Sequence, residues 1–288
     1  MEEFPDIVYW SVPAFLLLMV IEMISYRLLP DPDKVGYTGK DTVTSLAMGV
    51  GSEVWAIVLG VEYLLAYSAL YWLAPVKIDF AWWMFPALLV AQDFFYYWKH
   101  RSHHVVRFFW ASHVVHHSSE HFNLSTAMRH SWFSPGGWIF YAPLILLGFH
   151  PPAVLFCHSV NLLYQFWVHT ERIGKLPRPI EFLMITPSHH RVHHAAQGSY
   201  LDRNFGGIFV VWDRLFGSFA EEVEKPRYGL TKPINTYNPF RVAFHEWSAL
   251  ARDLRHARGW SDRFAYLVRP PGWHPEPRAR DEEVGATR

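Results

Sequence analysis

Five apolar runs lie within the first 170 residues, and polar segments separate them. Residues 7–26, 54–74 and 80–98 each approach the ~20 residues that a helix needs to cross a hydrocarbon core about 30 Å thick. Residues 80–98 are also edged by tryptophans and tyrosines, as is usual at a membrane surface. We therefore expect three membrane-crossing helices. A soluble all-α protein with an unusually apolar core is the alternative.

Two shorter apolar runs, residues 138–148 and 153–167, follow a polar, histidine-rich stretch. Between them stands Phe-His-Pro-Pro at residues 149–152, which cannot continue a helix. The pattern predicts a short, tilted or partial helical hairpin. Glu22, Glu62 and Asp93 lie inside apolar runs, where a carboxylate is costly unless it is paired or faces a cavity.

Basic residues follow the first and third runs: Arg27, Lys34, Lys40, Lys99, Arg101 and Arg107. The positive-inside rule then predicts an outside N-terminus and places the chain from His100 onward in the cytoplasm. The expected fold is an all-α integral membrane bundle of about three crossings plus a short helical hairpin, with a cytoplasmic, helical, histidine-rich cap. Residues 1–268 are expected to form one domain, and residues 269–288 a loose C-terminal tail.

Composition narrows the function classes. The chain has 288 residues, of which 18% are charged, and its formal net charge is zero. No basic face is therefore indicated, and nucleic-acid binding is not expected. The single Cys157 excludes a disulfide framework and a cysteine-rich zinc or iron–sulfur site.

The anomaly is the 18 histidines, nine of which form three His-x-x-His-His motifs. These are His100/His103/His104, His113/His116/His117 and His190/His193/His194. Residues i, i+3 and i+4 share one face of a helix, so each triplet is predicted to aim its imidazoles at one point. Imidazole binds iron, zinc, copper and nickel. Histidines outside the motifs, such as His130 and His158, are expected to be ordinary polar or structural residues.

Nine imidazoles are candidates for metal ligands: His100, His104, His113, His116, His117, His169, His190, His193 and His194. His169 joins them because it ends the last apolar run, with Gln165 one turn earlier on the same face. His103 and His189 stand next to ligand candidates, but helical neighbours point ~100° apart, so we expect both at the rim.

A carboxylate is expected to accept a hydrogen bond from a ring nitrogen that does not bind metal. Asp93 falls on the same helical stripe as His100 and His104, where it would accept a ring N–H and fix the tautomer. Glu120 and Asp213 are further candidates for this role. Arg191 and Arg214 are candidates to meet an anionic head group or to form surface salt bridges.

Nine imidazoles exceed the four ligands of a structural zinc site, which argues for two metal ions. Neutral imidazoles, with few carboxylates and no thiolates, fit two ferrous ions that activate O₂. The alternative is a membrane metal transporter or a metal-storage protein. Transport sites, however, lie near the bilayer midplane on broken helices, whereas these motifs follow helix ends in polar sequence.

Longer motifs carry a resemblance to a known family. They are DFFYYWKHRSHH at residues 93–104, HVVHHSSE at 113–120, NLST at 123–126, QFWVHTE at 165–171, TPSHHRVHH at 186–194, and NFGG followed by WDRLFG between 204 and 217. Together they resemble the fatty acid hydroxylase/sterol desaturase superfamily, and within it the alkylglycerol monooxygenase-like branch. The resemblance covers residues 93–219.

This resemblance implies an integral-membrane, non-haem di-iron oxygenase whose nine listed imidazoles hold two irons on the cytoplasmic face. It implies O₂ as co-substrate and a membrane lipid whose alkyl or acyl chain is hydroxylated, oxidatively cleaved or desaturated. It also implies an electron donor, either a pterin, a ferredoxin or a b-type cytochrome, and hence a redox partner. Gln165 stands where some members have a histidine, and Val105 where the alkylglycerol monooxygenases have a glutamate. Oligomeric state is not indicated.

Overall fold

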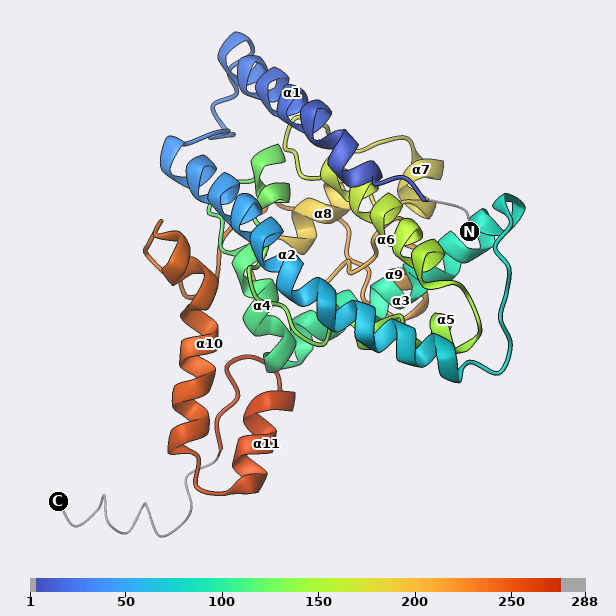
Figure 1. Ribbon diagram of the computed structural model, residues 1–288. Coiled ribbons are helices and arrows are strands. Elements are labelled where there is room, and N and C mark those ends of the chain that lie inside the picture. The colour runs from blue at the N-terminus through green and yellow to red at the C-terminus, as the bar shows by residue number, and fades with distance from the viewer. Residues whose placement is uncertain (1–3, 276–288) are drawn as a thin grey trace, which may run out of the picture.

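The computed structural model describes residues 4–275, and the regular elements within that range are all helices (Figure 1). In chain order they are α1 (Ile7–Leu28), α2 (Gly39–Leu73), η1 (Trp82–Met84), α3 (Phe85–Val105), α4 (Arg107–His117), η2 (Leu124–Met128), η3 (Gly137–Phe140), α5 (Ala142–Leu146), α6 (Pro151–Phe166), α7 (Arg178–Leu183), α8 (Pro187–His193), α9 (Val211–Leu215), α10 (Pro239–His256) and α11 (Trp260–Val268). Three isolated β-bridges occur between other segments. The all-α prediction is confirmed for these residues.

Helices α1 and α2 are long and apolar enough to cross a membrane. Their apolar stretches are only 11% and 6% buried inside the protein. A core helix of a soluble protein would instead hide its apolar side chains from solvent. This exposure is typical of helices that lipid surrounds, so the chain has the character of a membrane protein.

The other apolar runs fold differently from the expectation. The third run forms η1 and α3, and α3 extends to Val105, so its second half is polar and carries the first histidine triplet on a buried face. Residues 138–148 do not form one helix, because Tyr141 separates η3 from the five-residue α5. Pro151 and Pro152 do not lie outside a helix; they begin α6, where the first turn needs no N–H donor.

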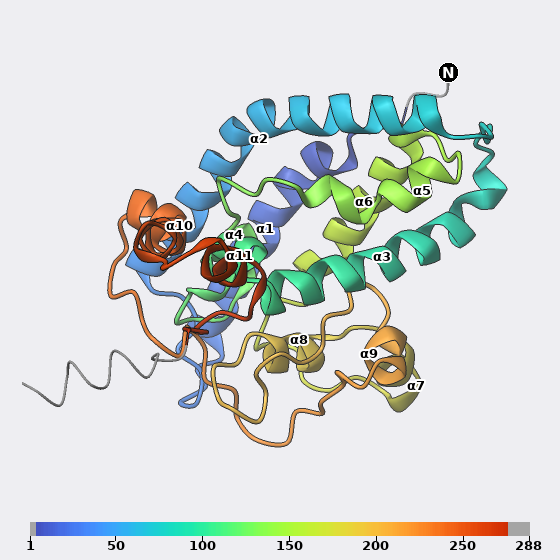
Figure 2. The ribbon, with the colours of Figure 1, turned by 90° about the horizontal axis from the view of Figure 1, so that it is seen from below.

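The helices form two layers around the histidine motifs (Figure 2). In this view α1, α2, α5 and α6 lie on one side, and α7, α8 and α9 on the other. Helices α3 and α4 lie between them; α3 packs against α4 and α6, and α6 packs against α1. Cys157 is buried among the apolar side chains where α2, α3 and α6 meet, as a core role predicts.

A C-terminal helical pair, α10 and α11, packs on α4. Arg107 of α4 forms ion pairs of 2.8 and 2.7 Å with Glu246 and Asp253 of α10. Part of the tail expected at residues 269–288 also has contacts, since Arg107 N donates to the Arg269 carbonyl and Trp273 packs on Tyr266. Residues 276–288 lie outside the described range.

Each carboxylate that the sequence places inside an apolar run has polar partners. Glu22 of α1 accepts hydrogen bonds from Leu124 N at 2.8 Å and from the Tyr37 and Thr170 hydroxyls. Glu62 of α2 accepts from Gly136 N and from the Trp138 indole. These bonds tie the two long helices to the segments that surround the histidines.

Replacement of Glu22 by alanine should destabilise the folded protein, because Leu124 N, Tyr37 and Thr170 would lose a buried acceptor. An unsatisfied buried group costs about 1–3 kcal/mol, so we expect a clear fall in the thermal unfolding midpoint in detergent. Glu53→Ala is the matched control, since Glu53 is an exposed glutamate of α2. Equal midpoints for the two variants would contradict the structural role of Glu22.

Candidate metal centre

Four chain segments deliver the histidines. His100 and His104 lie on the last turns of α3; His113, His116 and His117 lie on α4; His190, His193 and His194 lie at α8; and His169 follows α6. Only Val106 separates α3 from α4, and its extended backbone (φ −115°, ψ 114°) turns the chain between the two helices. The first two motifs therefore face each other across a one-residue joint.

The structure gathers all nine predicted imidazoles into two groups. The five-histidine group contains His100, His104, His113, His117 and His193, and the four-histidine group contains His116, His169, His190 and His194. Within each group, one nitrogen of every ring lies within 4.8 Å of the corresponding nitrogens of the others. His103 and His189 belong to neither group, as the helical geometry predicts.

The expectation that each triplet aims at one point is wrong for α4 and α8. In α4, His113 and His117 join one group and His116 joins the other; in α8, His190 and His194 stay together and His193 crosses over. Residues i and i+4 differ by about 40° around a helix, whereas i+3 and i+4 differ by about 100°. The i, i+4 pairs therefore stay together, and each of these helices serves both groups.

Backbone carbonyls fix the orientation of three of the rings. The Nδ1 atoms of His100, His169 and His193 lie 2.8, 2.7 and 2.9 Å from the carbonyl oxygens of Phe205, Gln165 and Arg203. A carbonyl only accepts, so these Nδ1 atoms carry the proton and donate it. In the neutral ring, Nε2 is then left with a lone pair directed into the group.

The inward nitrogens lie close together. His100 Nε2 is 3.0 Å from His113 Nε2, and His169 Nε2 is 2.9 Å from His190 Nε2. His104 Nε2, His193 Nε2, His194 Nε2 and His190 Nδ1 are buried without a hydrogen-bond partner. Buried polar atoms in proteins are nearly always paired. Converging lone pairs and unpartnered nitrogens fit a site that is completed by a cation.

Burial lowers the pKa of every histidine in the two groups. The pKa of His169 falls to about 3, chiefly through desolvation. The neighbouring imidazoles add to this effect around His113 and His194, because a second positive charge close by is unfavourable. The rings are thus neutral at pH 7, which is the form that binds metal ions.

Sequence comparison assigns the family. Residues 85–218, which hold all nine histidines of the two groups, match the sequence model of the family described as fatty acid hydroxylase. This segment, a little under half of the chain, belongs to the fatty acid hydroxylase family. The chain is similar to alkylglycerol monooxygenase of Homo sapiens, with 41% identity over 282 residues, and to that of Danio rerio, with 40% identity over 286 residues.

These two alignments cover 96% and 97% of this chain but 62% and 63% of the relatives. The chain thus spans about three fifths of the length of these curated relatives. It is also similar to the ornithine lipid hydroxylase OlsE of Rhizobium tropici, with 26% identity over 73% of this chain and 67% of that protein. The comparison with solved structures gave no significant match.

In this fatty acid hydroxylase domain, the predicted carboxylates do not bind the histidines directly. Asp93 accepts hydrogen bonds from Ile208 N at 2.7 Å, Phe209 N at 3.1 Å and the Trp212 indole at 2.8 Å. The prediction that Asp93 accepts a ring N–H is therefore wrong. A helical stripe gives the direction of a side chain, but not the segment that meets it.

Asp213 also binds backbone rather than imidazole. Its two oxygens accept from Phe205 N at 2.7 Å and Gly206 N at 2.8 Å, and Ser218 adds a third donor. Burial raises the pKa of Asp213 to about 6, so it remains a carboxylate at pH 7. Asp93 and Asp213 together hold residues 205–209, and the Phe205 carbonyl of this segment orients His100.

Gly207 allows this arrangement. A Cβ atom at residue 207 would lie 2.4 Å from Asn161 Oδ1 and 2.8 Å from Asp93 Oδ1. Asn161 donates to Asp93 at 2.7 Å, so neither side chain can move without losing that bond. A glycine is needed for the backbone to approach the carboxylate this closely.

Glu120 is exposed and makes no hydrogen bond to a histidine, so its predicted role is wrong. Instead, the carboxylate that reaches a ring is Asp202, whose Oδ1 lies 3.4 Å from His104 Nδ1. Asp202 adopts a positive φ of 56°, which turns it back toward α3. No spacing in the sequence signals this contact.

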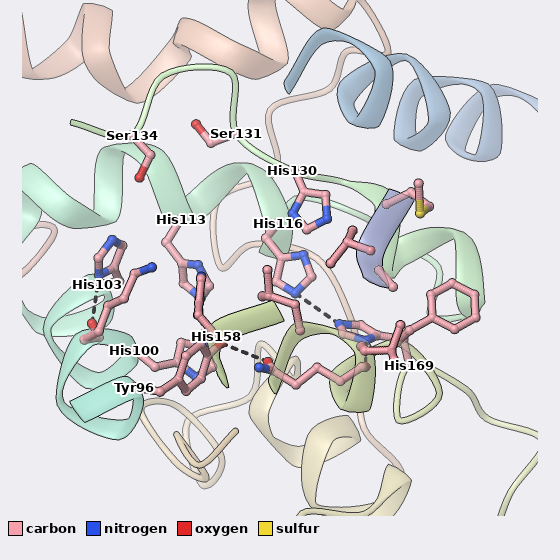
Figure 3. A pocket seen from close by; sticks show the side chains of 18 of the residues that line it. Tyr96, His100, His103, His113, His116, His130, Ser131, Ser134, His158 and His169 are labelled. Atoms are coloured by element: carbon pink, nitrogen blue, oxygen red, sulfur yellow. Dashed lines mark hydrogen bonds between the residues drawn. The ribbon is translucent and has the colours of Figure 1, made fainter. Parts of the chain in front are cut away.

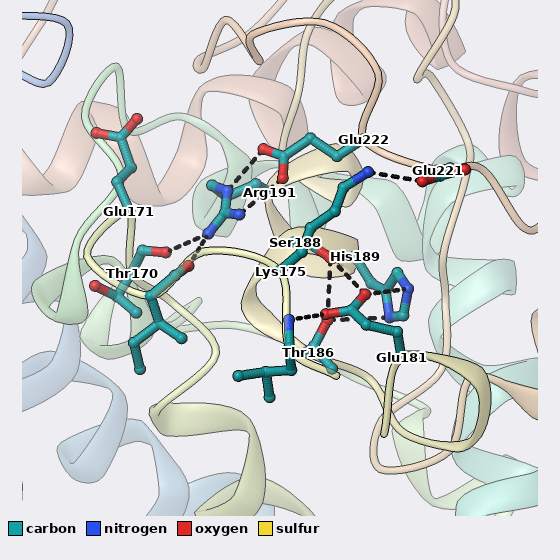
Figure 4. A network of polar contacts seen from close by, with 12 residues as sticks. Thr170, Glu171, Lys175, Glu181, Thr186, Ser188, His189, Arg191, Glu221 and Glu222 are labelled. Carbon is teal, nitrogen blue, oxygen red and sulfur yellow. Dashed lines mark hydrogen bonds and ion pairs between the residues drawn. The ribbon is translucent and has the colours of Figure 1, made fainter. Parts of the chain in front are cut away.

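A polar network holds α8 from behind (Figure 4). Arg191 forms two 2.7 Å bonds to Glu222 and donates to the carbonyls of Thr170 and Ile173. Arg191 is therefore paired with Glu222 inside the protein and is not available to bind an anionic head group. His189 lies 3.0 Å from Glu181, outside both groups. Arg214 stacks 3.8 Å over the Phe219 ring.

Gln165 contributes to the site through its backbone and its side chain. Its carbonyl orients His169, and its side-chain oxygen accepts from the Tyr96 hydroxyl at 2.8 Å. Gln165 also lines the cavity described next, so it lies beside the metal candidates, as expected, without being one of them.

A cavity of about 320 Å³ lies against both groups (Figure 3). His100 and His113 border it from the five-histidine group, and His116 and His169 from the four-histidine group. His130 and His158 also line this cavity. The sequence predicted only ordinary polar or structural roles for them, because both stand outside the repeated motifs. Lys99 lines it too, and burial lowers the pKa of its ammonium group to about 8.

Asp213→Ala should weaken metal retention, because Phe205 N and Gly206 N would lose their acceptor and the carbonyl that orients His100 would be less well held. Loss of such an outer contact typically reduces metal affinity 10–100-fold. Metal remaining after competition with a chelator measures the effect. Asp79→Ala, at an exposed aspartate outside the site, is the control. Equal retention by the two variants would contradict the assigned role.

The metal-free protein should lose stability as the pH falls. Unfolded histidines take up protons near pH 6.5. The buried ones, with their lowered pKa values, take them up only at much lower pH. Below about pH 6.5 the unfolded state therefore binds more protons, and the free energy of unfolding decreases. Denaturant unfolding of the metal-free protein at pH 7.5, 6.5 and 5.5 tests this; an unfolding free energy that stays constant or rises toward pH 5.5 would contradict it.

Proposed function

We propose that this chain is a membrane-bound, non-haem di-iron oxygenase that uses O₂ to hydroxylate the alkyl or acyl chain of a lipid. The observation that carries the proposal is the pair of histidine groups, whose ring nitrogens converge and include four that are buried without a hydrogen-bond partner. Two separate groups support two ions. Seven of the nine rings stand on α3, α4 and α8, and the other two, His169 and His194, follow the ends of α6 and α8.

In this proposal the five-histidine group holds one iron and the four-histidine group holds the other. Neither group contains a carboxylate or a thiolate. Imidazole suits ferrous iron, and the bound irons would supply the redox chemistry that activates O₂ toward an unactivated C–H bond. The chain's own residues hold neutral nitrogens at fixed positions, through the carbonyls of Phe205, Gln165 and Arg203.

A lipid substrate is supported by the cavity and by the relatives. Val8 and Phe15 of α1, with Leu162 and Phe166 of α6, supply apolar walls next to the histidines. The names of the similar proteins describe an alkylglycerol monooxygenase and an ornithine lipid hydroxylase, both of which act on lipids. Hydroxylation of a C–H bond by O₂ also consumes two electrons to reduce the second oxygen atom to water, so a reductant or a redox partner must bind.

We further propose that α1 and α2 anchor the site at the cytoplasmic face. The α1–α2 turn lies on the site side, because Asn123 donates to the Gly36 carbonyl at 2.8 Å and Arg129 pairs with Asp41 at 2.9 Å. Basic residues cluster at this turn, as the positive-inside rule requires of a cytoplasmic segment.

Iron content and lipid products together test this function. The full chain, purified in detergent after growth with added iron, should contain about two irons, one for each histidine group. Producing cells should contain an oxidised lipid that control cells lack. His116→Ala removes a ring of the four-histidine group, and His193→Ala removes one of the five-histidine group. Each should abolish the product and lower the iron content to about half or less.

His256→Ala is the matched control, since His256 is exposed on α10 and lies outside both groups. It should retain the iron and the product. A folded His116→Ala variant with full activity would overturn the oxygenase assignment. Two bound irons without any oxidised lipid would favour a metal-storage role instead.

A further inference from the structure

The cavity next to the histidines has a polar end and an apolar end (Figure 3). In this view His103 and Ser134 lie at one end and His169 at the other, with His113 and His116 between them. Phe15, Met128 and Phe166 line the cavity together with His169. The two histidine groups thus border the middle of an elongated space.

Lys99 supplies the positive charge of this cavity. Its side chain is half-buried, and among residues 4–275 its ammonium group has no hydrogen bond or ion pair. Its closest recorded partner is the Tyr141 ring, whose centroid is 5.4 Å away. A partly buried ammonium without a counter-charge is unfavourable.

Among residues 4–275, no carboxylate lines the cavity. Its polar lining consists, besides Lys99, of histidines, serines, Tyr96 and Gln165. A histidine ring is either neutral or positively charged, so the histidines at its border cannot balance the lysine charge. The described protein therefore leaves an electropositive cavity with a place for one anionic group.

Further donors lie in the segment that follows η2. His130 and Ser131 both line the cavity. The His130 side chain has a large accessible surface, and it faces this space. Its ring has no hydrogen-bond partner among the described residues. Ser134 adds a hydroxyl that lies 3.3 Å from Ser112, which also lines the cavity.

We propose that the polar end of this cavity binds the anionic oxygen group of an amphiphilic substrate, a phosphate or a carboxylate, with Lys99 as its main contact. The alkyl chain then passes the two histidine groups and leaves between α1 and α6. This inference rests on the proposed function and specifies its substrate class. Since Lys99 lines the same cavity as His100 and His113, the oxidised carbon lies close to the polar end of the substrate.

A neutral head group fits this site less well. Hydroxyl groups can donate to and accept from the serines, but they leave the ammonium charge unbalanced in a low-dielectric space. An anion forms a charge-assisted hydrogen bond to it, which is roughly twice as strong as a neutral one. Affinity for the head group, rather than turnover, is thus the property that Lys99 controls.

Binding of three probes of equal chain length tests the proposal without turnover. Dodecyl phosphate, dodecanoate and 1-dodecanol are titrated calorimetrically into the iron-loaded full chain in a neutral detergent, without reductant. We expect at least one of the two anions to bind about tenfold or more tightly than the alcohol. The stronger of the two anions identifies the head group as phosphate or carboxylate.

Lys99→Met should lower the affinity for that anion about tenfold and leave the affinity for 1-dodecanol unchanged, while Lys99→Arg should retain the preference. Lys232→Met, at an exposed lysine outside the cavity, should match the unmodified chain. Equal binding of all three probes by the unmodified chain overturns the proposal, even if Lys99→Met fails to fold. So does an unchanged preference in a folded, iron-loaded Lys99→Met variant.

Because no oxidation occurs in this assay, its outcome is separate from that of the proposed function. An anion preference that depends on Lys99 would stand even if no oxidised lipid were found. Loss of that preference would leave the oxygenase assignment intact and would point to a neutral substrate.

Discussion

Ring nitrogens of neutral imidazoles meet at about 3 Å in the interior of this protein, and the rest of the structure depends on that arrangement. In each of these pairs one ring, His100 or His169, already donates through Nδ1 to a backbone carbonyl, so its inward Nε2 can only accept. Burial also prevents the rings from becoming charged. Four ring nitrogens of the two groups are also buried without a hydrogen-bond partner, so they are available to bind a cation, and the surrounding contacts hold the rings in place.

Those contacts come mainly from the backbone. Carbonyls of Phe205, Arg203 and Gln165 set the direction of three rings. Asp93 and Asp213 act one step further out, because each binds several N–H donors of the segment from Phe205 to Trp212. Carboxylates placed in this way stabilise the geometry without adding negative charge to the groups themselves. The cavity beside them keeps its positive character for the same reason.

The sequence could predict much of this arrangement. Repeated i, i+3, i+4 spacing identified eight of the nine histidines that the structure brings together, and His169 was predicted from its place at the end of an apolar run. The directions of helical neighbours separated His103 and His189 from them. Run lengths identified α1 and α2 as candidate spans. Helix α2 nevertheless begins at Gly39, well before the apolar run, and Asp41 in its first turn pairs with the distant Arg129. Periodicity within one helix was sufficient for these features.

Contacts between distant segments could not be predicted. Nothing local places Ile208 and Trp212 against Asp93, or Asp202 against His104, because more than 90 residues separate the partners. The division of the α4 and α8 motifs between two groups has the same origin, since it depends on what lies opposite each side of a helix. Lys99 and His130 gain their importance from a cavity that only the folded chain encloses.

That division has a thermodynamic consequence. Helices α4 and α8 each contribute rings to both groups, so an ion bound in one group restrains the helices that carry the other. The second ion then meets ligands whose conformational entropy has already been lost, and it binds more tightly than the first. By linkage this coupling is reciprocal, so the order of loading does not matter. Chains should accordingly exist mostly as empty or fully loaded molecules, and half-loaded ones should be scarce.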